Sequence, residues 1–197
     1  MESLFNLNTF VSYFSQSSAI TIFVLLLLSI YFIATFWIFL DRYYILNSHI
    51  KAEALSLKAL YTGQSKSVAS NSLIFTYLSR VNRPNKAILE AASSDAIRAS
   101  TKGLTWLSII ASTSPFIGLF GTVIGILETF SKLGSQSSAS LSVVAPAISE
   151  ALVATAAGIA VAIFAYTFHL ILKRKAYELS SLLASESDVI LSQVSEG

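Results

Sequence analysis

The fold is decided by two segments: Ser114–Gly125, with the sequence SPFIGLFGTVIG, and Glu150–Gly158, with the sequence EALVATAAG. Both lie in apolar stretches long enough to cross a bilayer, and each carries one threonine, Thr122 or Thr155. A helix that faces only lipid needs neither a small residue at every third or fourth position nor a carboxylate beside its apolar run. The two segments are therefore typical of membrane helices that pack closely around a polar path.

Three stretches of the chain contain no Lys, Arg, Asp or Glu: Ala19–Leu40, Gly103–Leu127 and Ala151–Leu172. Each is about as long as the roughly 20 apolar residues that a spanning helix needs. Of the 197 residues, 54% are hydrophobic and only 12% are charged, whereas a soluble domain has about 25% charged residues. The sequence therefore predicts an all-α membrane protein with three transmembrane helices.

Apolar residues also recur at helical spacing outside these stretches, as at Leu179, Leu183 and Ile190. We therefore expect long cytoplasmic helical extensions of the first two spans, and a third helix that runs from about 142 to about 190. The region between the first two spans is expected to form a small helical bundle.

Basic residues set the expected orientation, because they favour the cytoplasmic side of a membrane. None precedes Arg42, and Lys173, Arg174 and Lys175 directly follow the third run. These four side chains are predicted to be interface anchors, with the N-terminus outside and the C-terminus in the cytoplasm. The predicted division of the chain is an interfacial amphipathic helix at 1–18 (or, alternatively, a frayed terminus), a first span at 19–40, a cytoplasmic helical region at 41–102, a second span at 103–131, an outer loop at 132–141, a third span at 142–172 and a cytoplasmic helical tail at 173–197.

Small residues on one face of the second and third spans indicate close helix packing. Gly118, Gly121 and Gly125 share a helix face, and glycine costs about 1 kcal/mol in a helix interior unless close approach requires it. Proline within the second span frees a backbone carbonyl, which suits a bend or a cavity wall. The residues predicted to make this packing are Pro115, Gly118, Gly121, Gly125, Ala154 and Gly158.

Thr122, Thr155 and Glu150 are the predicted pore-lining residues of a proton pathway. Counted from outer ends near 131 and 142, the two threonines lie about 14 Å and about 20 Å deep at 1.5 Å per residue, so their hydroxyls are at similar height. The alternative for either threonine is a local bond to a carbonyl one turn back. Glu150 is costly within a membrane unless it faces water or a partner; the alternative is an ordinary interfacial charge.

Several functional classes find no support in the sequence. The chain has no cysteine, and it shows no metal-ligand cluster, phosphate-binding loop or nucleophile–base pair. We therefore expect no enzyme activity and no catalytic residue, cofactor, metal or nucleic-acid partner. No Asp lies in any predicted span. If the protein conducts protons, the deep carboxylate is expected to come from another chain.

The second and third spans closely resemble the signature segments of the ExbB/TolQ family, which is related to the flagellar stator protein MotA. The matching segments are Gly118–Ile126, with the sequence GLFGTVIGI, and Ala147–Gly158, with the sequence AISEALVATAAG. The three spans and the long loop after the first also fit. Ile124 departs from the pattern, because an aromatic Trp is common at that position.

The resemblance implies a pentamer around a central pore in the bacterial inner membrane. It implies that the pore holds a dimer of a single-span TolR- or ExbD-like protein, whose Asp takes and releases the proton. It also implies that Thr122, Thr155 and Glu150 match pore-lining positions. The work would pass to a TolA- or TonB-like protein, and membrane lipid would surround the assembly.

A TolQ role in envelope maintenance and cell division is slightly favoured, although the short N-terminal segment fits the short ExbB forms as well as TolQ. The first alternative is an ExbB-type energiser of outer-membrane import. A solute channel or a passive membrane scaffold is the further alternative, although a scaffold would not explain Glu150 beside two matched hydroxyls.

Overall fold

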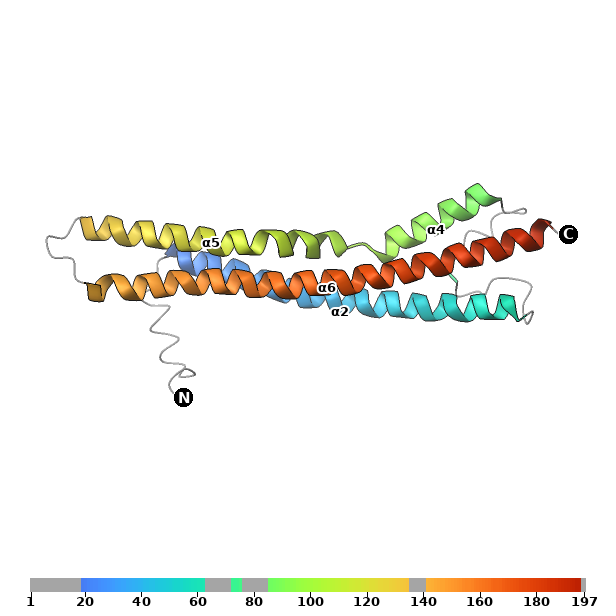
Figure 1. Ribbon diagram of the computed structural model, residues 1–197, viewed down its shortest axis with the longest axis horizontal. Coiled ribbons are helices and arrows are strands. Elements are labelled where there is room, and N and C mark those ends of the chain that lie inside the picture. Colours follow the sequence, from blue (N-terminus) through green and yellow to red (C-terminus); the bar gives the residue numbers. More distant parts are fainter. Residues whose placement is uncertain (1–18, 63–71, 76–84, 135–140, 196–197) are drawn as a thin grey trace, which may run out of the picture. The chain divides into compact units, whose positions relative to one another are not determined.

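The structure is a computed structural model that describes residues 19–62, 72–75, 85–134 and 141–195. These residues form α2 (Ala19–Tyr61), α4 (Lys86–Ser100), α5 (Leu104–Gly134) and α6 (Leu141–Ser195), with no strand among them (Figure 1). The all-α prediction is confirmed for this part of the chain. The helix predicted at 1–18 lies outside the described residues, as does 135–140 within the predicted outer loop.

Three helices, α2, α5 and α6, are long and apolar enough to cross a membrane. Only 17% of the most apolar window of α2 is buried within the chain, against 28% for α5 and 28% for α6. Most apolar side chains in these windows therefore face outward, which is stable only in lipid or against another protein. The prediction of three membrane-spanning helices is confirmed by length and composition.

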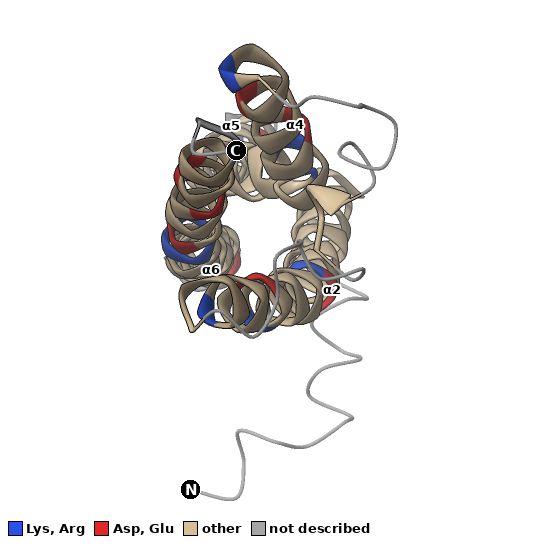
Figure 2. Ribbon diagram, turned by 90° about the vertical axis from the view of Figure 1, so that its right-hand side faces the viewer, with Lys and Arg blue, Asp and Glu red and all other residues tan. Residues whose placement is uncertain are grey.

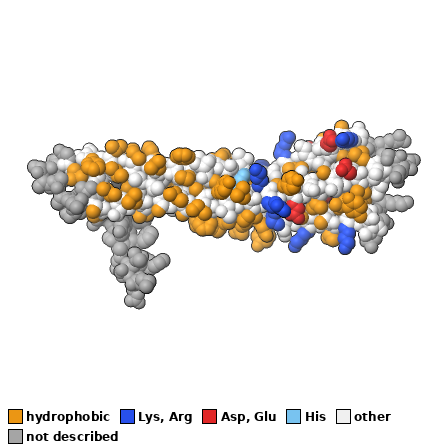
Figure 3. Space-filling model, in the orientation of Figure 1, with side chains coloured by type: hydrophobic (Ala, Val, Ile, Leu, Met, Phe, Trp, Pro, Cys, Tyr) orange, Lys and Arg blue, Asp and Glu red, His pale blue; other side chains and the backbone are white. Residues whose placement is uncertain are grey.

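The chain divides into two compact units. The apolar unit comprises the chain up to Phe36 and Leu107–Tyr166, and the charged unit comprises Trp37–Trp106 and the chain from Thr167. On the face in Figure 3 the coloured Lys, Arg, Asp and Glu side chains gather on the charged unit, while hydrophobic side chains cover the apolar unit. Figure 2 shows these charges distributed along α2, α4 and α6.

In the apolar unit, parts of α2, α5 and α6 run side by side (Figure 1). Large side chains of α2 and α5 fit against small ones of α6, which lets the helix backbones approach closely. The core consists of Val24, Leu28, Ile110, Ala154, Val161 and Ala165. Further along α2, the ring centroids of Phe32 and Phe36 each lie 5.7 Å from that of Phe164 on α6.

In the charged unit, apolar residues at helical spacing form a second core. It contains one stripe from each of α2, α4 and α6: Leu46, Ile50, Leu60, Leu89, Ala92, Ala96, Leu172, Leu179 and Leu183. The helix α4 begins at the N-cap Asn85, whose side-chain oxygen accepts a hydrogen bond from the backbone N–H of Ile88 at 2.9 Å.

A turn at Thr101–Gly103 separates α4 from α5, so α4 does not continue the second span as the sequence analysis expected. The backbone N–H of Thr101 donates to the carbonyl of Ile97 at 2.9 Å, and that of Leu104 donates to the carbonyl of Thr101 at 3.1 Å. Gly103 has a φ of +101°, the only positive φ among the described residues. Residues that carry a side chain rarely adopt this backbone conformation, so glycine at this position permits the chain to change direction.

Candidate functional site

The helices α5 and α6 make backbone contact at Gly118 and Gly158. A Cβ atom on Gly158 would lie 2.5 Å from the carbonyl oxygen of Ser114, and one on Gly118 would lie 2.6 Å from that of Ala154. Both distances are far below van der Waals contact, and the obstructing atoms belong to the backbone. Any larger residue at either position would force the two helices apart.

Gly121 and Gly125 extend the contact to α2. A Cβ atom on Gly121 would lie 3.0 Å from Val24 Cγ1. One on Gly125 would lie 3.3 Å from Ala151 Cβ and 3.7 Å from Thr21 Oγ1. The glycine face of α5 therefore lies against both neighbouring helices. A larger residue is tolerated less at Gly118 than at Gly125.

Thr122 and Thr155 meet directly beside this contact. Their hydroxyl oxygens lie 2.5 Å apart, and Thr122 also bonds the carbonyl of Ala151 at 2.8 Å. The carbonyl of Gly118 is 3.3 Å from both hydroxyls. Thr122 is buried and Thr155 is half-buried. The structure thus brings together two of the predicted site residues, which come from different helices.

The two hydroxyls have fewer protons than acceptors. Each threonine can donate once, so Thr155 can donate to Thr122 while Thr122 donates to Ala151, or Thr122 can donate to Thr155 while Thr155 donates to Gly118. These two arrangements run in opposite directions and differ only by rotation of the hydroxyl groups. Because the pair can reverse its donor and acceptor roles, it can take part in a proton path.

Glu150 lies immediately before Ala151 on α6, within one turn and a half of Thr155. Its side chain is half-buried, and its Oε1 atom is buried with no hydrogen-bond partner among the described residues. An unpaired carboxylate oxygen at such a place costs free energy. Glu150 does not join the threonine pair, and a partner for this oxygen would have to be water or a group outside the described residues.

Pro115 occupies the turn of α5 before Gly118. Because proline has no backbone N–H, it cannot donate to the carbonyl one turn earlier, at Ala111. The adjacent Ser114 hydroxyl is buried and donates to the Ile110 carbonyl at 2.6 Å. The helix α5 continues past Pro115, so the loss of this one backbone hydrogen bond does not end the helix.

The predicted interface anchors lie in the charged unit, away from the threonine pair in the chain. Arg42 Nε pairs with Asp41 Oδ2 at 3.1 Å. Lys175 Nζ donates to Asn47 Oδ1 at 2.9 Å and lies 4.6 Å from the Tyr43 ring centroid. Lys173 and Arg174 are exposed. Of these four predicted anchors, Lys175 is the one that ties α6 to α2.

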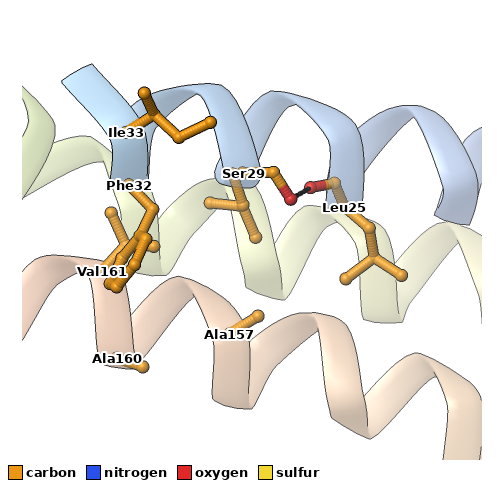
Figure 4. A pocket seen from close by; sticks show the side chains of 8 residues that line it. Leu25, Ser29, Phe32, Ile33, Ala157, Ala160 and Val161 are labelled. Atoms are coloured by element: carbon orange, nitrogen blue, oxygen red, sulfur yellow. Dashed lines mark hydrogen bonds between the residues drawn. The ribbon is translucent and has the colours of Figure 1, made fainter.

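A groove between α2 and α6 offers no polar path. Figure 4 shows Leu25, Ser29, Phe32 and Ile33 of α2 facing Ala157, Ala160 and Val161 of α6. The one hydroxyl in this lining, that of Ser29, donates to the carbonyl of Leu25 at 2.8 Å. The groove has no free hydroxyl with which to bind a polar solute.

Sequence analysis missed two buried carboxyl groups in the charged unit, Glu53 and Glu186, both with no exposed surface. Burial, a hydrogen bond with Glu53 and repulsion from its charge raise the pKa of Glu186 to about 8, while bonds from the Ser56 and Ser72 hydroxyls oppose the shift. The sequence did contain a sign that Glu186 is buried, because this residue continues the helical spacing of the buried Leu179 and Leu183.

Comparison with known proteins assigns the chain to a family. Residues 67–185 match the model of the MotA/TolQ/ExbB proton channel family. The chain is 42% identical over 187 residues to the Helicobacter pylori biopolymer transport protein ExbB-like 1, covering 95% of this chain and 99% of the relative. It is 31% identical over 181 residues to the Tol-Pal system protein TolQ of Haemophilus influenzae, covering 78% of this chain and 79% of the relative. The match includes both glycine-lined helices and the threonine pair, and the chain belongs to the MotA/TolQ/ExbB proton channel family.

Proposed function

We propose that this protein is a proton-channel subunit of the bacterial inner membrane that converts proton motive force into mechanical work. Several copies, five by resemblance to the family, surround a central pore. The N-terminus faces the periplasm and the C-terminus faces the cytoplasm, as the basic residues indicate.

The observation that carries the proposal is the bonded pair Thr122–Thr155. Two hydroxyls from different helices share a 2.5 Å hydrogen bond at membrane depth, beside a glycine contact that leaves room for no larger side chain. The two hydroxyls can exchange donor and acceptor roles, which a step in a proton path requires. The half-buried Thr155 is the member that can present its hydroxyl to a group outside the chain.

The proton-binding carboxylate is proposed to come from a partner. No Asp occurs in the predicted spans, and Glu150 is not bonded to the threonine pair. A single-span TolR- or ExbD-like protein, present as a dimer in the pore, would supply an Asp that takes a proton on one side and releases it on the other. The threonine hydroxyls would orient that carboxyl and pass the proton, and Glu150 would hold water at the outer approach.

The mechanical output is proposed to reach a TolA- or TonB-like protein. The sequence favours a Tol-Pal role in envelope maintenance and division. The full-length similarity to an ExbB-like protein supports the alternative, an ExbB-type energiser of outer-membrane import, equally well. The two branches share the same proton path and differ in the partner that receives the work.

The test is proton flux into liposomes that contain the purified complex. With an imposed potential, we expect flux that depends on the partner subunit and is lost in Thr155→Val. The control is Thr155→Ser, which keeps the hydroxyl and should retain flux. Equal flux in Thr155→Val and the unmodified protein would contradict the proposed path. Deletion of the gene separates the branches: envelope leakage and division defects indicate a TolQ role, and loss of energised uptake indicates an ExbB role.

A further inference from the structure

A pair of carboxyl groups in the charged unit forms a polar cluster that the proposed channel does not use. Glu53 of α2 and Glu186 of α6 are both completely buried. Glu53 Oε1 accepts a hydrogen bond from the backbone N–H of Leu73 at 2.6 Å. Glu186 accepts from the Ser56 hydroxyl at 2.5 Å and from the Ser72 hydroxyl at 3.4 Å. The cluster thus joins α2, α6 and the segment 72–75.

One oxygen of the pair lacks a donor. Glu53 Oε2 is buried and accepts no hydrogen bond from any N–H or hydroxyl of the described residues. Two buried carboxylates cannot both stay ionised cheaply, because repulsion and lost hydration add together. A proton carried by Glu186 supplies the missing donor and removes the repulsion in one step.

No cation compensates the pair within the described residues. On α2, α4 and α6, every Lys and Arg of the described residues is exposed or has a partner elsewhere, and Glu150, the other half-buried carboxyl of α6, lies in the apolar unit. His49, half-buried on α2, bonds Ser100 at 3.1 Å, and Lys175 bonds Asn47. The exposed charged side chains on these helices include Lys51, Lys58, Lys86, Glu90, Asp95, Arg98, Lys173, Arg174, Glu178 and Asp188.

We propose that Glu53 and Glu186 share one proton and act as a pH-sensitive latch, which holds the segment 72–75 against α2 and α6 and releases it when the proton leaves. The segment is attached by few groups. Leu73 donates its N–H to Glu53, Ser72 donates its hydroxyl to Glu186, and Ile74 is fully buried beneath them. The carboxyl groups therefore hold both polar attachments of the segment.

Loss of the shared proton leaves two negative charges that only water or separation can relieve. The helices α2 and α6 are joined by many apolar contacts of the core, whereas segment 72–75 covers the pair with four residues. Water reaches the carboxylates at least cost by displacing this segment. Because burial and Glu53 raise the pKa of Glu186 to about 8, release of the segment becomes more favourable as the pH rises and is fully favoured at about pH 8.

A bound divalent cation is the competing occupant of two carboxylates. The geometry favours a proton, because the Leu73 N–H points at Glu53 Oε1 and a donor there repels a cation. The described residues also contain no group of three or more His, Asp or Glu side chains that could hold a metal ion. The experiment below distinguishes the two.

The absence of cysteine from the sequence makes a labelling test clean. Ile74→Cys places one thiol at a buried position of the segment, and Leu55→Cys places one at a site that is 67% exposed on α2. Both variants of the full-length protein, in detergent, are reacted with a water-soluble maleimide from about pH 5 to about pH 9, which covers the interval between the two pKa values and the plateau above it. The ratio of the two labelling rates cancels the titration of the thiol itself and reports opening of the segment.

We expect the ratio to be lowest near pH 4.5, to rise by up to about tenfold per pH unit towards pH 8 and to level off above it, because the exposed carboxyl loses its proton near 4.5 and the buried one at about 8. Glu186→Gln should keep the ratio low at every pH, because an amide cannot ionise. Glu178→Gln, on the exposed surface of the same helix, should behave as the unmodified chain does. If Glu186→Gln loses its helical circular dichroism, Glu53→Gln replaces it with the same expectation.

Three results would overturn the latch. A ratio that is flat with pH shows no release, and a pH response that survives Glu186→Gln or Glu53→Gln assigns it to other groups. A ratio that falls on addition of Mg²⁺ or Ca²⁺ above pH 8 assigns the site to a cation. None of these results depends on proton flux, so the latch and the proposed channel fail independently.

Discussion

Thr122 Oγ1 on α5 and Thr155 Oγ1 on α6 lie 2.5 Å apart, although the two residues come from different membrane helices. The contact is possible because Gly118 and Gly158 let the helix backbones touch one turn away. Close packing and polar chemistry therefore depend on one another here: the glycines set the distance at which the hydroxyls can bond. Changes at either kind of residue should affect the other.

Removing either hydroxyl should abolish energised function without preventing assembly. Valine has nearly the shape of threonine but cannot form these hydrogen bonds, so either substitution, Thr122→Val or Thr155→Val, leaves the partner hydroxyl less satisfied, and Thr122→Val also removes the donor to the Ala151 carbonyl. We expect proton-motive-force-dependent activity in cells to fall at least tenfold, since one lost transition-state interaction of about 1.4 kcal/mol suffices for that factor. Normal activity in both valine variants, at normal protein levels, would remove these residues from the path.

The glycine contact predicts a graded series of alanine variants. Gly118→Ala and Gly158→Ala place a Cβ atom at 2.6 Å and 2.5 Å from backbone oxygens, so they should destabilise the apolar unit. Overpacking typically costs about 1–3 kcal/mol, which outweighs the gain of about 1 kcal/mol in helix propensity. Gly125→Ala, whose nearest contact would be 3.3 Å, is the matched control.

Thermal unfolding in detergent checks this series. The two close-contact variants should melt below the unmodified protein, and Gly125→Ala should melt near it. A melting temperature for Gly158→Ala equal to that of Gly125→Ala would show that the backbones of α5 and α6 do not meet as described.

Replacement of Glu150 separates a path residue from a surface charge. Its unpaired buried oxygen indicates contact with water or another chain. We expect Glu150→Ala to cause a severe defect in function or assembly, and Glu150→Gln to assemble better than Glu150→Ala because the amide keeps the side-chain length. Unchanged activity and complex mass in Glu150→Ala would identify the residue as an ordinary interfacial charge.

The buried carboxyl pair predicts that stability falls as pH rises. In the unfolded chain Glu186 loses its proton near 4.5, whereas in the folded unit it does so at about 8. The folded state therefore binds more protons between these values, and its stability is greatest below 4.5 and is progressively lost up to about pH 8. Above that pH this contribution is constant.

Melting temperatures against pH test the sign of this effect. The difference in melting temperature between Glu186→Gln and the unmodified protein should grow by several degrees from pH 5 to pH 8, given roughly 2–4 °C per kcal/mol for a chain of this size. A constant difference across that range would mean that Glu186 ionises in the folded protein as it does in the unfolded one.

Much of the architecture follows from the sequence because lipid imposes strict rules on length and charge. The uncharged runs, the glycine face and the matched depth of Thr122 and Thr155 could all be found by counting residues. The third helix was expected from about 142 to about 190, and α6 covers Leu141–Ser195. Periodicity identifies such helices without knowledge of their neighbours.

Features that depend on contacts between distant segments could not be predicted in the same way. The bond between Glu186 and Ser56 joins residues 130 apart in sequence, so no local pattern reveals it. A Glu within an apolar stripe is a signal of burial, but its partner stays unknown until the helices are packed. The turn at Gly103 was hidden similarly, because a glycine beside an apolar run also suits a span that simply continues.

The central claim is that this chain conducts protons only together with a carboxylate-bearing partner. Its most direct test is the mass of the complex purified in mild detergent from native membranes. We predict several copies of this chain with a smaller single-span protein that carries an Asp in its membrane segment, and identification of that protein would also separate the TolQ and ExbB branches. A homo-oligomer without such a partner, under conditions that preserve weak complexes, would contradict the account.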